Sequence, residues 1–313
     1  MKPSSAALTF VVITIIYVGA LLFLDLSSFS DVRDMLQLFP FLVTLAFCSF
    51  LLRYLRWYWL LWRAQCTMPF WEGYLCYLSG FAFTASPGKV GELVRVRYLL
   101  NYDVHPSVTI SAFIYERALD LLVVLLIGSL VALVFDFFTW IAISIVLIIA
   151  AIMCVVRYPY FLRVIVFFLR RFGFRRLSTL MRLFTKGIRG ISRWLTFKDF
   201  AVSLILGATA WLIVSLSFVW LLNHIGEGLP IYTAISIYPV AMLVGALSML
   251  PGGIGTTEAA ITFQLVFYGV STVMAGLLAI CIRISTLWFA IICGMLSLIV
   301  LELKSMPQKE LPH

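Results

Sequence analysis

Apolar segments of membrane-spanning length leave this chain few folds to adopt. Such runs cover residues 6–24, 36–62, 107–135, 140–156, 200–222 and 271–301. Only helices and closed barrels satisfy their backbone groups in lipid, and a helix needs about 20 residues to cross the hydrocarbon core. The chain is 63% hydrophobic and 12% charged, whereas a soluble domain is nearer half apolar and a quarter charged. We therefore predict an all-α polytopic membrane protein with about six full transmembrane helices.

Two short stretches rich in glycine interrupt the apolar sequence in the same way. Each has Pro-Gly, two further residues, another Gly and a carboxylate close behind. The first break contains Pro87, Gly88, Lys89, Gly91 and Glu92. The second break contains Pro251, Gly252, Gly253, Gly255, Thr256, Thr257 and Glu258. Either alone could be an ordinary turn between helices. Matched breaks half a chain apart indicate an internal repeat and are typical of transporter substrate sites.

Basic residues predict the orientation in the membrane. Residues 157–198 contain eleven Lys or Arg and no Asp or Glu, interleaved with apolar side chains. The positive-inside rule places this amphipathic segment on the cytoplasmic leaflet. Both termini then lie in the cytoplasm, and the predicted location is the cell inner membrane. The net charge of +9 is explained by topology and anionic lipid, so we predict no nucleic-acid partner. A cleaved signal peptide over residues 6–24 is disfavoured, since its basic region would be Lys2 alone.

The same rule predicts how the two breaks enter the membrane. If residues 70–86 crossed completely, Lys89, Arg95 and Arg97 would lie outside. We therefore predict a re-entrant hairpin from the cytoplasm at the first break and one from outside at the second, where residues 257–267 are too short to span. Repeat one, at about residues 36–135, and repeat two, at about 199–303, then have opposite orientation. This is an inverted-topology repeat within one domain over residues 1–313.

Charged residues inside the predicted spans are candidate site residues. Glu116, Arg117 and Asp120 share one helix face by their spacing, and Arg283 lies at a similar place in the last span. Charges at that depth are costly and by default functional. The alternative for the Glu116–Asp120 group is a structural ion pair that joins two helices. The alternative for Arg53 is that its side chain extends to the lipid headgroups.

A helix that restarts inside the membrane presents unpaired N–H groups and a positive dipole end, which bind phosphate or carboxylate. We expect both breaks to present such ends to one midplane cavity, with Thr256 or Thr257 capping the second. The expected phosphate ligands are Arg53, Arg117 and Arg283. The carboxylates expected to hold these arginines, or to carry protons, are Glu92, Glu116, Asp120 and Glu258. The apolar surroundings favour a lipid with a phosphate headgroup.

Three motifs carry a resemblance to a known family. They are the Pro-Gly-x-x-Gly-Glu-x-x-Arg run from Pro87 to Arg95, Glu116-Arg117-x-x-Asp120, and the run from Pro251 to Glu258. Together they resemble the lysylphosphatidylglycerol synthase transmembrane family, also called flippase-like or UPF0104, over nearly the whole chain. The resemblance implies lipid translocation: bifunctional members flip aminoacylated phosphatidylglycerol, and others are tied to polyprenyl-phosphate sugars. We expect a standalone member without the aminoacyltransferase domain.

We predict a lipid translocase for an anionic, phosphate-containing lipid, such as a phospholipid, an aminoacyl-phospholipid or a polyprenyl-phosphate-linked sugar. We predict no catalytic residue, metal or cofactor, because the six cysteines form no C-x-x-C and Lys89 lacks the Ser/Thr that follows a P-loop lysine. The first alternative is a membrane-embedded lipid-modifying enzyme that uses the paired carboxylates. The second is an accessory subunit that binds a glycosyltransferase through residues 157–198. A homodimer is also left open.

Overall fold

The computed structural model describes residues 29–130, 190–226 and 228–305, together with Trp140, Ile143 and Leu147. Every regular element within these ranges is helical. The predicted spans at residues 6–24 and 140–156, and residues 157–189 of the basic segment, lie outside the described ranges apart from the three single positions. Both chain termini also lie outside them, so their predicted orientation stays a prediction.

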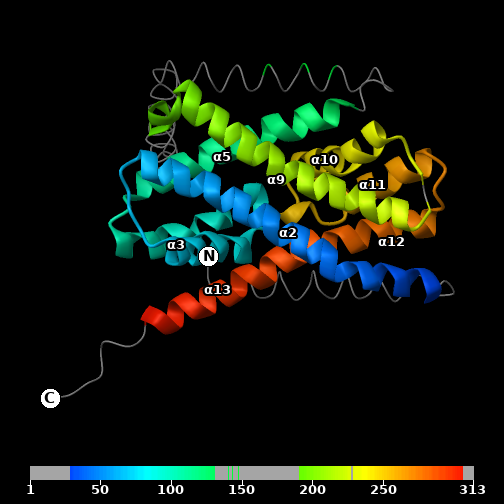
Figure 1. The fold of residues 1–313 in the computed structure, drawn as a ribbon, viewed down its shortest axis with the longest axis horizontal. Coiled ribbons are helices and arrows are strands. Elements are labelled where there is room, and N and C mark those ends of the chain that lie inside the picture. The colour runs from blue at the N-terminus through cyan, green and yellow to red at the C-terminus, as the bar shows by residue number, and fades with distance from the viewer. Residues whose placement is uncertain are drawn as a thin grey trace, which may run out of the picture.

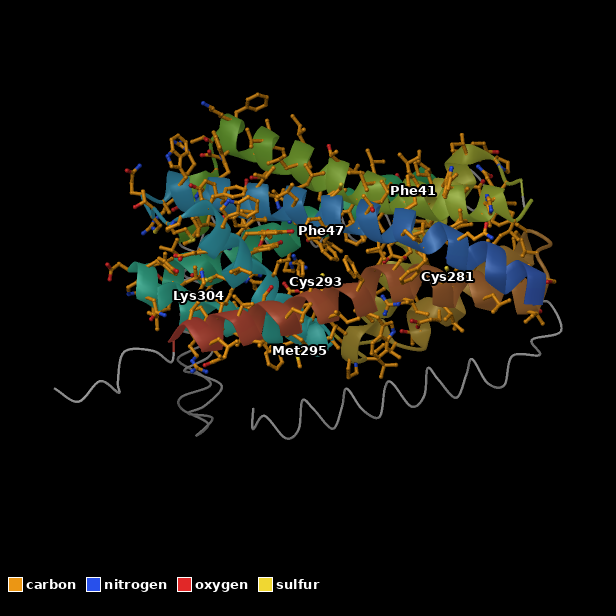
Figure 2. All side chains as sticks on the ribbon, turned by 60° about the horizontal axis from the view of Figure 1, so that its bottom comes forward. Phe41, Phe47, Cys281, Cys293, Met295 and Lys304 are labelled. Atoms are coloured by element: carbon orange, nitrogen blue, oxygen red, sulfur yellow. The ribbon has the colours of Figure 1, made fainter. Side chains whose placement is uncertain are left out.

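Within the described ranges, three helices are long and apolar enough to cross a membrane. The first is α2 (Phe29–Arg63), which begins seven residues before the predicted span. The second is α9 (Phe197–His224). The third runs continuously through α12 (Thr272–Arg283), a π-helical turn η7 (Ile284–Trp288) and α13 (Phe289–Ser305). These helices, with their exposed apolar flanks, are those of a multi-pass membrane protein, as Phe41, Phe47 and Met295 illustrate in Figure 2.

The helix α5 (Pro106–Gly128) has 23 residues and lies against α9 and α10 (Ile231–Leu247). It carries three charged residues near its middle, Glu116, Arg117 and Asp120. The pair α2 and α9 packs side by side across the molecule (Figure 1). The Ser49 hydroxyl of α2 donates to the Ala210 carbonyl of α9 at 3.0 Å. Together α2, α5 and α9 form the frame to which the two breaks attach.

The first break is the turn of a helical hairpin. Its first limb is α3 (Phe70–Ser79) with η1 (Gly80–Phe83), and its second is η2 (Pro87–Val94) with α4 (Arg95–Leu99) and η3 (Leu100–Tyr102). The limbs are in close contact, since a Cβ on Gly80 would lie 3.0 Å from the Glu92 carbonyl oxygen. The hairpin also packs against α13.

The second break is the turn of another hairpin. Its limbs are α10 and α11 (Thr256–Phe267), which pack together, and η6 (Pro251–Gly253) forms the turn. Three glycines in the turn have positive φ: Gly252 at 64°, Gly253 at 63° and Gly255 at 82°. Residues with a side chain rarely adopt this left-handed conformation, so the turn depends on glycine here.

The two hairpins approach one another from opposite ends of the molecule. Figure 1 shows α3 near the end where α2 finishes, while α10 to α12 lie toward the end where α2 begins. The turns touch in the middle, where η2 and η6 are in contact. A Cβ on Gly252 would lie 3.4 Å from the Cα of Ala85. The breaks that sequence analysis singled out are therefore adjacent in space.

Candidate functional site

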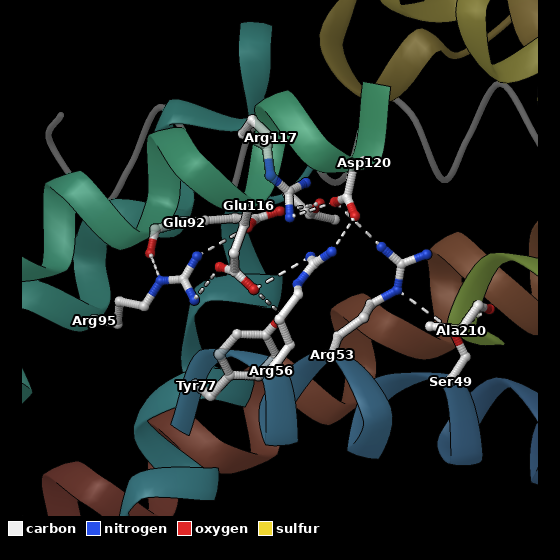
Figure 3. A network of polar contacts seen from close by, with 11 residues as sticks. Ser49, Arg53, Arg56, Tyr77, Glu92, Arg95, Glu116, Arg117, Asp120 and Ala210 are labelled. Carbon is white, nitrogen blue, oxygen red and sulfur yellow. Dashed lines mark hydrogen bonds and ion pairs between the residues drawn. The ribbon is translucent and has the colours of Figure 1, made fainter. Parts of the chain in front are cut away.

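Three arginines converge on one carboxylate between α2 and α5 (Figure 3). Asp120 accepts from Arg56 at 2.8 Å, from Arg117 at 3.0 Å and from Arg53 at 3.4 Å. The Arg56 guanidinium also lies 3.4 Å from Glu116 and is fully buried. Because α2 supplies Arg53 and Arg56 while α5 supplies the acids, the network joins these two helices.

The first break is attached to the same network through Arg95. Its guanidinium lies 3.2 Å from the Glu92 carboxylate and 3.8 Å from that of Glu116. It also lies over the ring of Tyr77, 4.9 Å from the centroid. The other oxygen of Glu92 accepts from the Thr84 hydroxyl at 2.9 Å. Buried charges persist only when they are paired and hydrogen-bonded in this way, so Arg95 and Glu92 fix the position of the break.

The second break is held by Arg283, which comes from the last spanning helix. The Arg283 Nε lies 2.8 Å from Glu258 Oε1, and its Nη2 donates to the Gly252 carbonyl at 2.6 Å. Glu258 Oε2 accepts from the Gly255 N–H at 2.7 Å. Arg283 is 1% exposed, and the π-helical turn begins directly after it. Its first role is therefore to fix the backbone of the turn.

The helix start after each break differs from the sequence-based expectation. At the second break the N-cap of α11 is Gly255, and neither threonine holds that position. The reason is the positive φ of Gly255, together with Glu258 reaching back to its N–H. At the first break the chain resumes as a 3-10 helix, and the Ser86 hydroxyl already accepts from the Gly91 N–H at 2.7 Å. An α-helix therefore starts directly at the second break only.

Two adjoining cavities of about 240 Å³ and 80 Å³ lie where the breaks meet. Both are lined by Lys89 and Arg117, and also by the aromatic Trp211 of α9. The larger one touches both breaks, since Ser86 and Gly252 line it. Together the linings carry four basic side chains and two carboxylates, an excess of two positive charges. Such a chamber favours an anion.

Lys89 is a basic side chain of this chamber that takes no part in the ion pairs described above. Its backbone N–H donates to the Ser86 carbonyl at 2.9 Å, but its ammonium group makes no hydrogen bond or ion pair with the residues that the structure describes, although it lines both cavities. Its φ of 56° lies in the left-handed region, where a residue with a side chain is uncommon and often functional. Arg117 beside it is 22% exposed through its side chain. These two cations are the groups with the greatest freedom to bind an added anion.

The eighteen predicted site residues fall into two groups in the structure. Nine line the cavities: Arg53, Lys89, Glu92, Arg117, Asp120, Gly252, Gly253, Thr257 and Arg283. The other nine belong to the breaks or to the ion pairs around them: Pro87, Gly88, Gly91, Arg95, Glu116, Pro251, Gly255, Thr256 and Glu258.

Sequence reasoning missed three residues of this site. Arg56 is not among the predicted site residues, although it is fully buried between Asp120 and Glu116. A possible signal was Gly207 of α9, where a Cβ would lie 2.5 Å from the Arg56 guanidinium. Tyr77 and Trp211 had no distinguishing signal, because aromatic residues occur throughout the apolar segments. Within the described residues no cluster of His, Cys, Asp or Glu is arranged to hold a metal ion.

Comparison with known proteins agrees with these motifs. The family described as "Lysylphosphatidylglycerol synthase TM region" matches residues 6–294. A UPF0104 membrane protein of Methanothermobacter thermautotrophicus (strain ATCC 29096 / DSM 1053 / JCM 10044 / NBRC 100330 / Delta H) is 31% identical over 122 residues, which are 38% of this chain and 36% of that protein. The chain thus spans about a third of the length of this relative. No solved structure matches the chain. The match covers most of the sequence and confirms the resemblance, so the chain belongs to the lysylphosphatidylglycerol synthase TM region family.

Proposed function

We propose that this protein is a lipid translocase that moves an anionic, phosphate-containing lipid across the cell inner membrane. The observation that carries the proposal is the chamber between the two breaks, with unpaired Lys89 in its wall. A phosphate diester carries one negative charge, and Lys89 with Arg117 offers two cations for it. Charge-assisted hydrogen bonds of this kind are about twice as strong as neutral ones.

The proposed topology has six spans and two re-entrant hairpins, with both termini in the cytoplasm. It is supported by the exposed aromatic residues at the end of the molecule where α2 finishes. Trp62, Trp71 and Phe197 are 52%, 71% and 87% exposed. Arg63 and Lys198 lie beside them in the sequence. Tryptophans and bases together are typical of the cytoplasmic interface, so the first hairpin enters from the cytoplasm and the second from outside.

Liposome reconstitution tests the proposal. Purified protein is inserted into vesicles that contain phosphatidylglycerol with a fluorescent acyl chain, and dithionite quenching reports the lipid that reaches the outer leaflet. We expect faster exchange than in empty vesicles, and little exchange of the matching phosphatidylcholine, whose headgroup carries no net charge. Lys89→Met should reduce exchange at least tenfold, about the effect of losing one charged hydrogen bond of 1.5–3 kcal/mol.

The matched control is Lys198→Met, which removes a lysine that is exposed and lies outside the chamber. It should transport like the wild type. Equal activity of Lys89→Met and wild type would contradict the assignment of this chamber. Chemical turnover of the headgroup in detergent would instead support the lipid-modifying enzyme. Exchange that appears only when a glycosyltransferase is added would support the accessory subunit.

A further inference from the structure

The larger cavity reaches the surface of the molecule through its side, between α5 and the second break. Three of its lining residues are also exposed: Ala246, Met249 and Leu250. Met249 is 65% exposed and Leu250 is 47% exposed. Across from them, Leu121 of α5 lines the cavity and is half-buried. We call this opening the portal and define it by these four residues and Leu243.

The portal lies at the depth of the membrane midplane. Leu121 follows the start of α5 by fifteen residues, or about 22 Å of helix, and Ala246 follows the start of α10 by the same distance. The two helices begin at opposite ends of the molecule (Figure 1). Gly128 of α5 lies beside Val240 of α10, since a Cβ on Gly128 would lie 3.2 Å from the Val240 side chain, and this register places Leu121 near Ala246. About 22 Å from either end is the middle of a bilayer 40–45 Å thick.

The cavity changes in chemistry from its inner end to the portal. Its inner end has Lys89, Arg117 and Asp120, whereas the portal is formed by apolar side chains. At the midplane the portal faces hydrocarbon, which a water-soluble anion does not enter. A molecule that fills such a cavity has an anionic group at one end and a hydrocarbon chain at the other.

We infer that the portal is the acyl-chain site of this protein, and that the tails of the transported lipid extend through it into the bilayer. The inference rests on the proposed function and adds the route. The headgroup crosses inside the chamber, bound by Lys89 and Arg117, while the tails stay in hydrocarbon throughout. The tails then avoid water, and the charge avoids lipid. Recognition therefore requires both the anionic group and at least one long acyl chain.

A plug in the portal tests the route. Ala246→Trp places an indole at the opening, whereas Leu247→Trp changes the next residue, which is 74% exposed and does not line the cavity. In the vesicle assay with fluorescent phosphatidylglycerol, Ala246→Trp should lower exchange at least tenfold, and Leu247→Trp should stay within twofold of wild type. Similar activity in the two variants would overturn the portal while leaving lipid transport by the wild type intact.

Photolabelling provides a readout that needs neither turnover nor a variant. Wild-type protein in vesicles is irradiated with phosphatidylglycerol that carries a diazirine in its acyl chain, and the labelled residues are found by mass spectrometry. We expect adducts at Leu121, Leu243 or Met249 that excess unlabelled phosphatidylglycerol removes. Adducts confined to the outer surface, such as Ile205 and Leu296, would overturn the portal. Portal adducts without any exchange would support the acyl-chain site and contradict the proposed transport.

Discussion

At the residue scale, the buried charges separate into those that hold the structure and those that face the chamber. Arg283 contacts Glu258 and the Gly252 carbonyl of the second break and is 1% exposed. Arg117 has Asp120 as its partner and is 22% exposed. Asp120 keeps two other arginines when Arg117 is removed, whereas Arg283 binds both a carboxylate and a backbone carbonyl of the second turn.

Substituting these two arginines should therefore give different results. Arg283→Met removes the buried guanidinium that binds Glu258 and the Gly252 carbonyl, and we expect a loss of stability of about 3 kcal/mol, the usual effect of breaking a buried ion pair. Arg117→Met should be less destabilising, by at least 1 kcal/mol, yet should abolish exchange of phosphatidylglycerol. Thermal unfolding in detergent and the vesicle assay measure the two effects. Equal losses of stability in both variants would contradict the distinction.

The burial of each arginine side chain could be predicted from the sequence only in part. Charges in apolar runs drew attention to Arg53, Arg117 and Arg283, whose side chains are 11%, 22% and 1% exposed. The burial of Arg56 depends on Gly207, which lies on another helix and leaves room for the guanidinium. The apolar periodicity of residues 36–62 carries no information about that contact. Contacts of this kind, between helices far apart in the sequence, could not be predicted from the sequence.

At the element scale, the turn of the first hairpin requires a glycine at position 91. At the first break, a Cβ on Gly91 would lie 2.6 Å from the Cβ of Phe83 and 2.7 Å from the Ser86 hydroxyl. These are closer than real side-chain contacts allow, so the turn must shift if Gly91 gains a side chain. Because Lys89 lies in the same turn, such a shift moves the cation that we assign to phosphate binding.

Gly91→Ala should accordingly destabilise the protein by about 1–3 kcal/mol, as overpacking does in other cores, and should impair exchange. Gly276→Ala in α12 is the matched control, since a Cβ there meets nothing within 4 Å. A helical alanine in open space should be neutral or stabilising by up to about 1 kcal/mol. Thermal unfolding compares the two. A normal unfolding temperature for Gly91→Ala would show that the turn is looser than the structure indicates.

The sequence predicted some helical elements and missed others. Both breaks and the long apolar helices followed from Pro-Gly punctuation and apolar run length. The π-helical turn at Ile284–Trp288 did not, because its residues continue the apolar pattern of the helix around it. The 3-10 helix after the first break was also missed, since a Pro-Gly start suits several helix types. Where the backbone departs from the regular α-helix, side-chain patterns give little information.

At the scale of the whole molecule, two hairpins of opposite direction meet in the middle and enclose a chamber. Contact between Ala85 and Gly252 joins positions 167 residues apart in the sequence. The inverted repeat predicted this proximity, since two hairpins that enter from opposite sides end at the same depth. The composition of the chamber wall, with Trp211 of α9 in it, required the packed helices.

Disulfide cross-linking between the two turns tests this central claim most directly. In a variant without the six native cysteines, Ala85→Cys and Gly252→Cys are introduced together, because the Cβ atoms would lie 3.5 Å apart. That distance is within the range for a disulfide, about 3.5–4.5 Å. The matched control pairs Ala85→Cys with Gly255→Cys, whose Cβ would have no neighbour within 4 Å.

Membranes that contain each variant are treated with a mild oxidant, and linked peptides are identified by mass spectrometry. We expect the 85–252 pair to form a disulfide rapidly and the 85–255 pair to remain reduced. Free thiols at both 85 and 252 under the same conditions would contradict the meeting of the two breaks, and with it the shared chamber.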